Sequence, residues 1–115
     1  MVERAVAAKG RDYLRALQGQ GIAVRFGVIF GSWALGTAHR WSDIDLVVVS
    51  PQFDNMTSRG YIDLLWCQAA RVDSRIEPIA CGEKQWEEDH SSVILEIARR
   101  EGERIALDEE HAHPA

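Results

Sequence analysis

Two short stretches decide the fold of this chain: GSWALG at residues 31–36 and, after five further residues, SDIDL at residues 42–46. The first follows Ile22–Phe30, a segment rich in valine, isoleucine and phenylalanine, and the second opens the β-branched run Ile44–Val49. Both segments have the composition of strands. The sequence therefore predicts two strands that are joined by a tight turn, a short helix and a polar loop.

The turn after the first strand carries residues that suit an anionic ligand. Glycine at position 31 lets the backbone bend sharply and approach a ligand closely. We expect a short helix from Ser32 to about Gly36, and the amides at the start of a helix attract phosphate oxygens. The Ser32 hydroxyl adds a donor to this cradle. Gly31 and Ser32 taken alone could also form a plain strand-to-helix turn, so the residues that follow decide between these roles.

Asp43 and Asp45 are the candidate metal ligands. Side chains alternate along a strand at about 3.3 Å per residue, so the two carboxylates share a face and lie roughly 7 Å apart along the chain. Two anions at the end of an apolar strand repel each other and require a positive partner. Magnesium prefers carboxylate and phosphate oxygens. The spacing therefore predicts a magnesium site at Asp43 and Asp45.

Glu77 is the candidate for a third carboxylate. It lies inside a predicted third strand, whereas Asp73 precedes that strand and is typical of a turn. If the third strand pairs beside the second, Glu77 reaches the same site, where it could complete a two-metal clamp and accept the proton of an acceptor hydroxyl. A surface ion pair is the alternative role for Glu77.

The rest of the chain predicts further helices and one more strand. Apolar residues recur at helical spacing in three segments, and Pro78 restricts the third strand to the edge of a sheet because proline donates no ladder hydrogen bond. Ser91 or Ser92 caps the last helix, which we expect to bury its apolar residues and to end at Gly102. The predicted elements are a helix from Val2 to about Leu17, a helix between Met56 and Arg71, a strand at Arg75–Ala80, a last helix with the apolar face Ile94, Leu95, Ile97 and Ala98, and a short closing segment at Ile105–Leu107.

Composition indicates one α/β domain with a short mixed sheet flanked by helices, spanning residues 1–108, and a flexible acidic tail at residues 109–115. The 115 residues are 46% hydrophobic and 27% charged, which fits a single core. A formal net charge of −5 argues against a general nucleic-acid-binding protein. No stretch is long enough to span a membrane, no signal peptide is evident, and two cysteines make no disulfide framework, so we expect a reduced, cytoplasmic setting.

The four tryptophans and the two cysteines are expected to serve packing. Tryptophan supplies a large buried area, although Trp33 or Trp41 could instead stack on a nucleotide base. Cys67 and Cys81 are expected to behave as small buried hydrophobes.

The combination of Gly31-Ser32, Gly36 and the SDIDL run at residues 42–46 resembles the signature of the DNA polymerase β-like nucleotidyltransferase superfamily, in particular its minimal single-domain prokaryotic members. The resemblance covers the local motif tightly and most of the chain loosely, through the order of its elements. It implies a palm-like fold, contacts from Gly31, Ser32 and Ser42 to a triphosphate, and metal binding by Asp43, Asp45 and Glu77. Two Mg²⁺ ions and ATP or another nucleoside triphosphate are the implied cofactor and substrate.

The resemblance also suggests a biological role. Many minimal members are encoded beside a small helical HEPN-type partner and resemble antitoxins that adenylylate a tyrosine of that toxin. We therefore expect transfer of a nucleoside monophosphate, AMP, to a hydroxyl acceptor, with a protein partner or a homo-oligomer completing the site. Many members carry arginine where this chain has Leu35, so a positive charge near the phosphates is either missing or supplied by Arg40 or Arg75. The alternative is a catalytically inactive binding module that acts by complex formation.

Overall fold

The computed structural model describes residues 2–55 and 59–108. The elements in chain order are α1 (Arg4–Gly19), β1 (Phe26–Phe30), α2 (Ser32–Leu35), β2 (Ile44–Val49), the 3₁₀ helix η1 (Pro51–Phe53), α3 (Arg59–Val72), β3 (Ile76–Cys81), α4 (Glu83–Glu88), α5 (Val93–Glu101) and β4 (Glu103–Ile105). The strands form one sheet in the order β3-β2-β1-β4, in which β1 is antiparallel to β2 and β4, and β2 is parallel to β3. The predicted α/β class with a short mixed sheet flanked by helices is confirmed.

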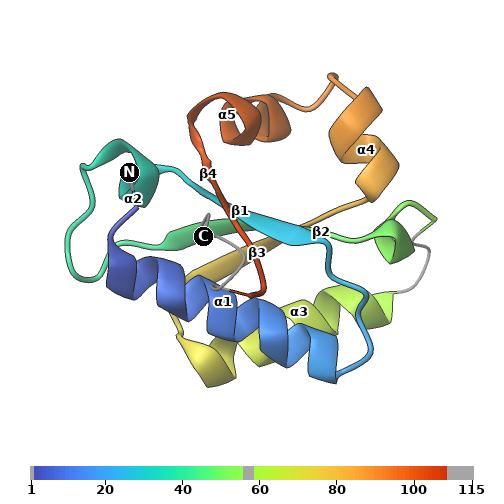
Figure 1. Ribbon diagram of the computed structural model, residues 1–115, viewed down its shortest axis with the longest axis horizontal. Helices are drawn as coiled ribbons and strands as arrows, with labels where there is room; N and C mark the ends of the chain where they lie inside the picture. The colour runs from blue at the N-terminus through green and yellow to red at the C-terminus, as the bar shows by residue number, and fades with distance from the viewer. Residues whose placement is uncertain (1, 56–58, 109–115) are drawn as a thin grey trace, which may run out of the picture.

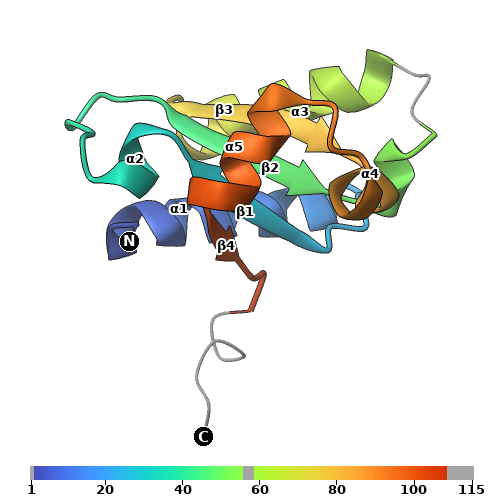
Figure 2. The same cartoon turned by 90° about the horizontal axis from the view of Figure 1, so that it is seen from above.

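Helices cover both faces of the sheet. Figure 1 shows α1 and α3 below the strands and α4 and α5 above them, and Figure 2 shows α5 crossing the sheet from above. Because side chains alternate across a strand, each face has its own core. Tyr13, Leu46 and Leu65 belong to the core on the side of α1 and α3, whereas Val47 and Leu95 belong to the core under α5. The sheet is therefore the central layer of the molecule.

The predicted first helix, short helix and second strand are confirmed. β2 coincides with the predicted Ile44–Val49, and α2 begins at Ser32 as expected. α1 buries every apolar residue that defined its predicted stripe, together with Val2 just before it: Val2, Val6, Tyr13, Leu14 and Leu17. Burial of that stripe against the sheet stabilises a helix whose centre contains Gly10.

The first strand is shorter than the prediction of Ile22–Phe30. Ile22 and Val24 are buried in the core, but their backbone bends: the Val24 amide donates to the Ile22 carbonyl at 2.9 Å, and the Ile22 amide donates to the Leu17 carbonyl at 3.1 Å. These local hydrogen bonds replace ladder bonds, so the strand begins only at Phe26. The apolar composition of this segment correctly predicted that Ile22 and Val24 are buried. It incorrectly predicted that they belong to the strand.

The third strand lies at the sheet edge, as Pro78 predicted. β3 runs from Ile76 to Cys81, and in its pairing with β2 Pro78 stands opposite Leu46. The second predicted helix corresponds to α3, although Met56, where it was expected to begin, lies outside the described residues. The predicted tail at residues 109–115 also lies outside them, so the domain boundary stays a prediction.

α4 was not predicted. Its sequence, EKQWEE, is almost entirely polar and carries no helical apolar stripe. The helix start is stabilised from a distance, because the Asp54 carboxylate accepts hydrogen bonds from the backbone amides of Lys84 at 3.1 Å and Gln85 at 3.2 Å. A local contact, in which the Gln85 side chain accepts from the Gly82 amide at 3.1 Å, supports the same turn, but the cap from Asp54 comes from a distant segment and leaves no signal in the sequence of α4.

α5 confirms its predicted cap and end but not its predicted face. Ser92 Oγ accepts from the Leu95 amide at 3.3 Å, and the helix stops at Gly102. Leu95 and Ala98 are buried, whereas Ile94 and Ile97 are 51% and 38% exposed. The prediction that they face the core was wrong, because only two residues of α5, Leu95 and Ala98, are buried against the sheet. The closing segment forms β4, two residues earlier than Ile105–Leu107.

Two tryptophans and one cysteine do not pack as expected. Trp41 is 71% exposed, Trp66 is 49% exposed and Cys67 is exposed, while Cys81 is buried. Burial had been predicted from residue type alone. Trp41 is exposed because it lies on a loop, and Trp66 and Cys67 are exposed because they lie on the outer face of α3. Among the described helices, none is both long and apolar enough to cross a membrane.

Candidate functional site

Three carboxylates meet at the starts of two parallel strands. Asp43 directly precedes β2, Asp45 is the second residue of β2, and Glu77 is the second residue of β3. In the register of the parallel pair, Asp45 stands opposite Glu77, so the two side chains share one face of the sheet. Val47 lies on the same face, which is the face covered by α5 and not the one packed against α1 and α3. The structure thus brings together all three predicted carboxylates.

Burial and neighbouring negative charge raise the pKa values of Asp45 and Glu77. Burial raises the pKa of Asp45 above its ordinary value, and the charge of Asp43 raises it further. Burial also raises the pKa of Glu77, with added contributions from the charges of Asp43 and Asp45 and from a hydrogen bond with the Asp43 side chain. Both shifts mean that the ionised forms are disfavoured. A cation at this point would therefore be attracted strongly.

The donor set fits magnesium in the way that this ion usually binds. Among the described residues, no three His, Cys, Asp or Glu side chains are arranged as a ready-made metal cluster. Magnesium in proteins is typically held by one or two carboxylates, with substrate phosphates and waters filling the other positions. Asp43 and Asp45, with Glu77 beside them, match that mode of binding rather than a closed structural metal site.

Gly31 is pressed against Asp45. It connects β1 to α2 with φ +75° and ψ −151°, a conformation that only glycine adopts readily. A Cβ atom placed on Gly31 would lie 2.3 Å from Oδ2 of Asp45. Phe30, the residue before Gly31, is paired with Asp45 across the β1–β2 ladder, which brings the turn and the carboxylate together. Glycine is required at position 31 because its backbone has a positive φ and because a side chain there would collide with the Asp45 carboxylate.

Ser32 and Ser42 occupy different settings. Ser32 opens α2, immediately after Gly31. Ser42 Oγ accepts a hydrogen bond from the His39 amide at 2.9 Å, and the Ser42 carbonyl accepts one from Nε1 of Trp33 at 3.0 Å. Ser42 thus shapes the loop before Asp43, and its predicted contact with a triphosphate stays a prediction.

Arg75, one of the two candidates for the charge that Leu35 lacks, is held by several other groups of the chain. Its guanidinium donates to both carboxylate oxygens of Asp73, at 3.0 and 2.7 Å, and lies 5.6 Å from the centre of the Trp33 ring. The hydrogen bonds from Arg75 lower the pKa of Asp73. Leu35 itself is 55% exposed. The guanidinium of Arg75 is therefore engaged by Asp73 and Trp33. The guanidinium of Arg40, the other candidate, lies over Trp41, 5.2 Å from the centre of its ring.

Sequence reasoning missed the roles of Trp33 and Asp73. Trp33 was expected to pack or to stack on a base, and Asp73 to form a turn. Both are tied to Arg75, and through it to the loop that precedes Asp43. The GSWALG motif shows that Trp33 is next to the turn, but its hydrogen-bond partner nine residues later is visible only in three dimensions.

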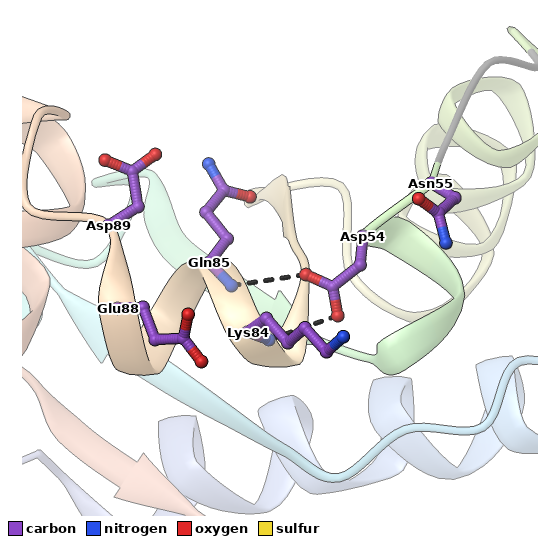
Figure 3. A pocket seen from close by; sticks show the side chains of 6 residues that line it. All are labelled: Asp54, Asn55, Lys84, Gln85, Glu88 and Asp89. Atoms are coloured by element: carbon purple, nitrogen blue, oxygen red, sulfur yellow. Dashed lines mark hydrogen bonds between the residues drawn. The ribbon is translucent and has the colours of Figure 1, made fainter.

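The surface is hollowed beyond the C-terminal end of β2, beside η1 and α4. A pocket of about 640 Å³ is lined by Asp54, Asn55, Lys84, Gln85, Glu88 and Asp89 (Figure 3). None of the predicted site residues belongs to it. Figure 3 shows the Asp54 carboxylate directed at the start of α4, where it accepts the two amide hydrogen bonds described above. The size of this pocket reflects an open surface beside a helix cap, so we place the functional site at the carboxylates.

Comparison with known proteins agrees with this geometry. The family model of the nucleotidyltransferase domain matches residues 9–109. A toxin–antitoxin structure determined with AMP-PNP is 20% identical, with a TM-score of 0.57 and coverage of 88% of this chain and 76% of that chain. A mutant form of the toxin–antitoxin MntA-HpeT is 16% identical, with a TM-score of 0.55 and coverage of 88% and 75%.

A protein assigned as a nucleotidyltransferase from Sulfolobus solfataricus is 19% identical, with a TM-score of 0.54 and 72% of each chain covered. No curated protein sequence matches this chain. At these identities the solved structures establish the fold, and the family assignment comes from the match that spans residues 9–109.

Proposed function

This chain belongs to the nucleotidyltransferase domain family, and we propose that it transfers a nucleoside monophosphate, AMP, from ATP to a hydroxyl group on a protein partner. The observation that supports this proposal is the register that sets Asp45 opposite Glu77, with Asp43 and Gly31 beside them. Carboxylates that share one face, next to a tight turn that suits phosphate, fit the requirements of nucleotidyl transfer.

The residues have distinct roles in the proposed reaction. Asp43 and Asp45 would hold Mg²⁺, with Glu77 as the third carboxylate; bound magnesium would neutralise charge on the triphosphate. Gly31 and Ser32 orient the phosphates. The acceptor oxygen attacks the α-phosphorus, its proton passes to Glu77, and the bond to the β-phosphate breaks to release pyrophosphate. Glu77 is proposed as the general base because it stands opposite Asp45 in the β2–β3 register, beside the atoms that the two aspartates would hold.

A helical toxin of the HEPN type is the partner that we propose, with a tyrosine hydroxyl as acceptor. Support comes from the structural relatives, two of which are toxin–antitoxin proteins, one determined with AMP-PNP. Further support comes from α5, whose outer side exposes Val93, Ile94 and Ile97. Clustered exposed apolar residues are typical of surfaces that bind another protein. A second copy of this chain is the competing occupant.

A binding module without chemistry is the second candidate, and the exposed Leu35 favours it, because many members of this family carry arginine there. Such a module would neutralise its partner through α5 alone. Intact Asp43, Asp45 and Glu77 favour the enzyme.

The deciding experiment is incubation of the protein with Mg²⁺ and α-labelled ATP, with and without the product of an adjacent gene. We expect label on the partner, and a loss of roughly 100-fold or more in Asp43→Asn and Asp45→Asn, the scale of removing one electrostatic stabiliser. Asp63→Asn, at an exposed position of α3, is the matched control and should transfer normally. Partner binding without label, for all four triphosphates, would establish the binding module instead.

A further inference from the structure

The position of Asp43 depends on the loop that precedes it. β2 begins at Ile44, so Asp43 lies just outside the strand and is exposed. The first contact of the ladder is made by the Ile44 amide, which donates to the Arg75 carbonyl at 2.8 Å. The peptide bond before Asp43 must therefore be oriented by contacts of the loop at residues 37–42.

Within the loop, two hydrogen bonds close a turn. The Ser42 amide donates to the His39 carbonyl at 2.9 Å, and the His39 amide donates to Ser42 Oγ at 2.9 Å. These bonds set the internal shape of the loop but do not attach it to the rest of the domain.

The attachment is made by Trp33. Its Nε1 atom donates to the Ser42 carbonyl oxygen at 3.0 Å. That oxygen belongs to the peptide group that joins Ser42 to Asp43, so the indole holds the plane from which the Asp43 side chain projects. The indole is partly buried and packs against the core on the α1 side.

Trp33 is in turn clamped by Arg75. The guanidinium lies 5.6 Å from the centre of the indole ring, an arrangement that is attractive for a cation over an aromatic face. Nη1 of Arg75 donates to the Arg40 carbonyl at 2.9 Å, which gives the loop a second anchor. Asp73 holds the other side of the guanidinium with bonds of 3.0 and 2.7 Å.

We propose that Trp33, clamped by the Asp73–Arg75 pair, is a positioning residue that presents Asp43 to the metal and triphosphate. Arg75 lies two residues before Glu77, so the same clamp links the loop before β2 to the start of β3. The inference rests on the proposed function for its consequence, but the loop contact itself can be measured without any substrate.

The test replaces one donor and keeps the ring. Trp33→Phe removes the Nε1 donor, and Trp66→Phe, at a half-exposed position of α3, is the matched control for the same change. Hydrogen exchange in the ligand-free protein should show faster exchange of the Ser42 amide in Trp33→Phe and no change in Trp66→Phe. The concentration of Mg²⁺ and ATP that half-saturates thermal stabilisation should rise about fivefold, the factor that corresponds to one lost hydrogen bond.

Arg75→Lys is a second variant in case Trp33→Phe folds poorly, because it keeps the positive charge while removing the fork that reaches both Asp73 and Arg40. It should show the same two changes. Exchange at Ser42 and half-saturation equal to those of Trp66→Phe would overturn the inference, even if the melting temperature falls. Faster exchange at Ser42 combined with no stabilisation of the native chain by Mg²⁺ and ATP would keep the anchor and reject the proposed function.

Discussion

Replacing Gly31 with alanine tests how closely the turn and the acid are coupled. Its φ of +75° and ψ of −151° lie in a region that is essentially restricted to glycine, where another residue costs about 1–3 kcal/mol. The new Cβ would lie 2.3 Å from Oδ2 of Asp45, whereas ordinary contacts begin at 3.4 Å. The carboxylate must therefore move by roughly 1 Å, the scale of misplacement that can cost about 100-fold in rate.

Two measurements separate the parts of this prediction. Urea unfolding of Gly31→Ala should show the loss of about 1–3 kcal/mol from the backbone. Transfer of label from α-labelled ATP should fall by about 100-fold under conditions in which the variant is fully folded. The first effect reports strain and the second reports the position of Asp45.

Gly36→Ala is the control for backbone strain alone. Gly36 also has a positive φ, +76°, but a Cβ at this position meets nothing within 4 Å. It should cost about 1 kcal/mol in stability and reduce transfer by less than about tenfold. If Gly31→Ala retains as much transfer as Gly36→Ala, the placement of Asp45 does not limit the reaction and the reasoning from its contact with Gly31 is wrong.

Two further predictions follow from charges in the fold. The native state raises the pKa values of Asp45 and Glu77, so it binds more protons than the unfolded chain between the ordinary and the raised values, and its stability falls as pH rises through that window. In magnesium-free buffer the double variant Asp45→Asn/Glu77→Gln should therefore be more stable than the native chain at pH 7, and denaturant titrations should show this advantage vanishing below about pH 4. Asp54→Ala should cost about 1 kcal/mol by removing the cap on the Lys84 and Gln85 amides, which should then exchange faster with deuterated solvent; unchanged exchange at both amides would contradict the capping role.

The part of the site that could be predicted consists of residues whose positions follow from local backbone geometry. Asp43 and Asp45 alternate with Ile44 in a β-branched run, so their shared face follows from strand geometry alone. Gly31 was recognisable because a turn after a strand favours glycine. Glu77 required the further assumption that the third strand pairs beside the second, and the register opposite Asp45 bears that assumption out.

The unpredictable part came from contacts between distant segments. α4 is capped by Asp54, thirty residues before Lys84, so this part of its stabilisation cannot be read from its own polar sequence. Arg75 was a candidate for phosphate binding until its pairing with Asp73 and its place over Trp33 were visible. Hydropathy placed Ile97 in the core, yet it is partly exposed.

The sequence by itself determined the class of the fold, the order of most elements and the shared face of Asp43 and Asp45, because hydrophobic periodicity, glycine placement and β-branching act over a few residues. Only the tertiary structure decided where the first strand begins, which side of α5 faces solvent, and how the loop before Asp43 is held. These features depend on contacts between segments that are distant in the sequence. Such tertiary contacts can override the local preference of each segment.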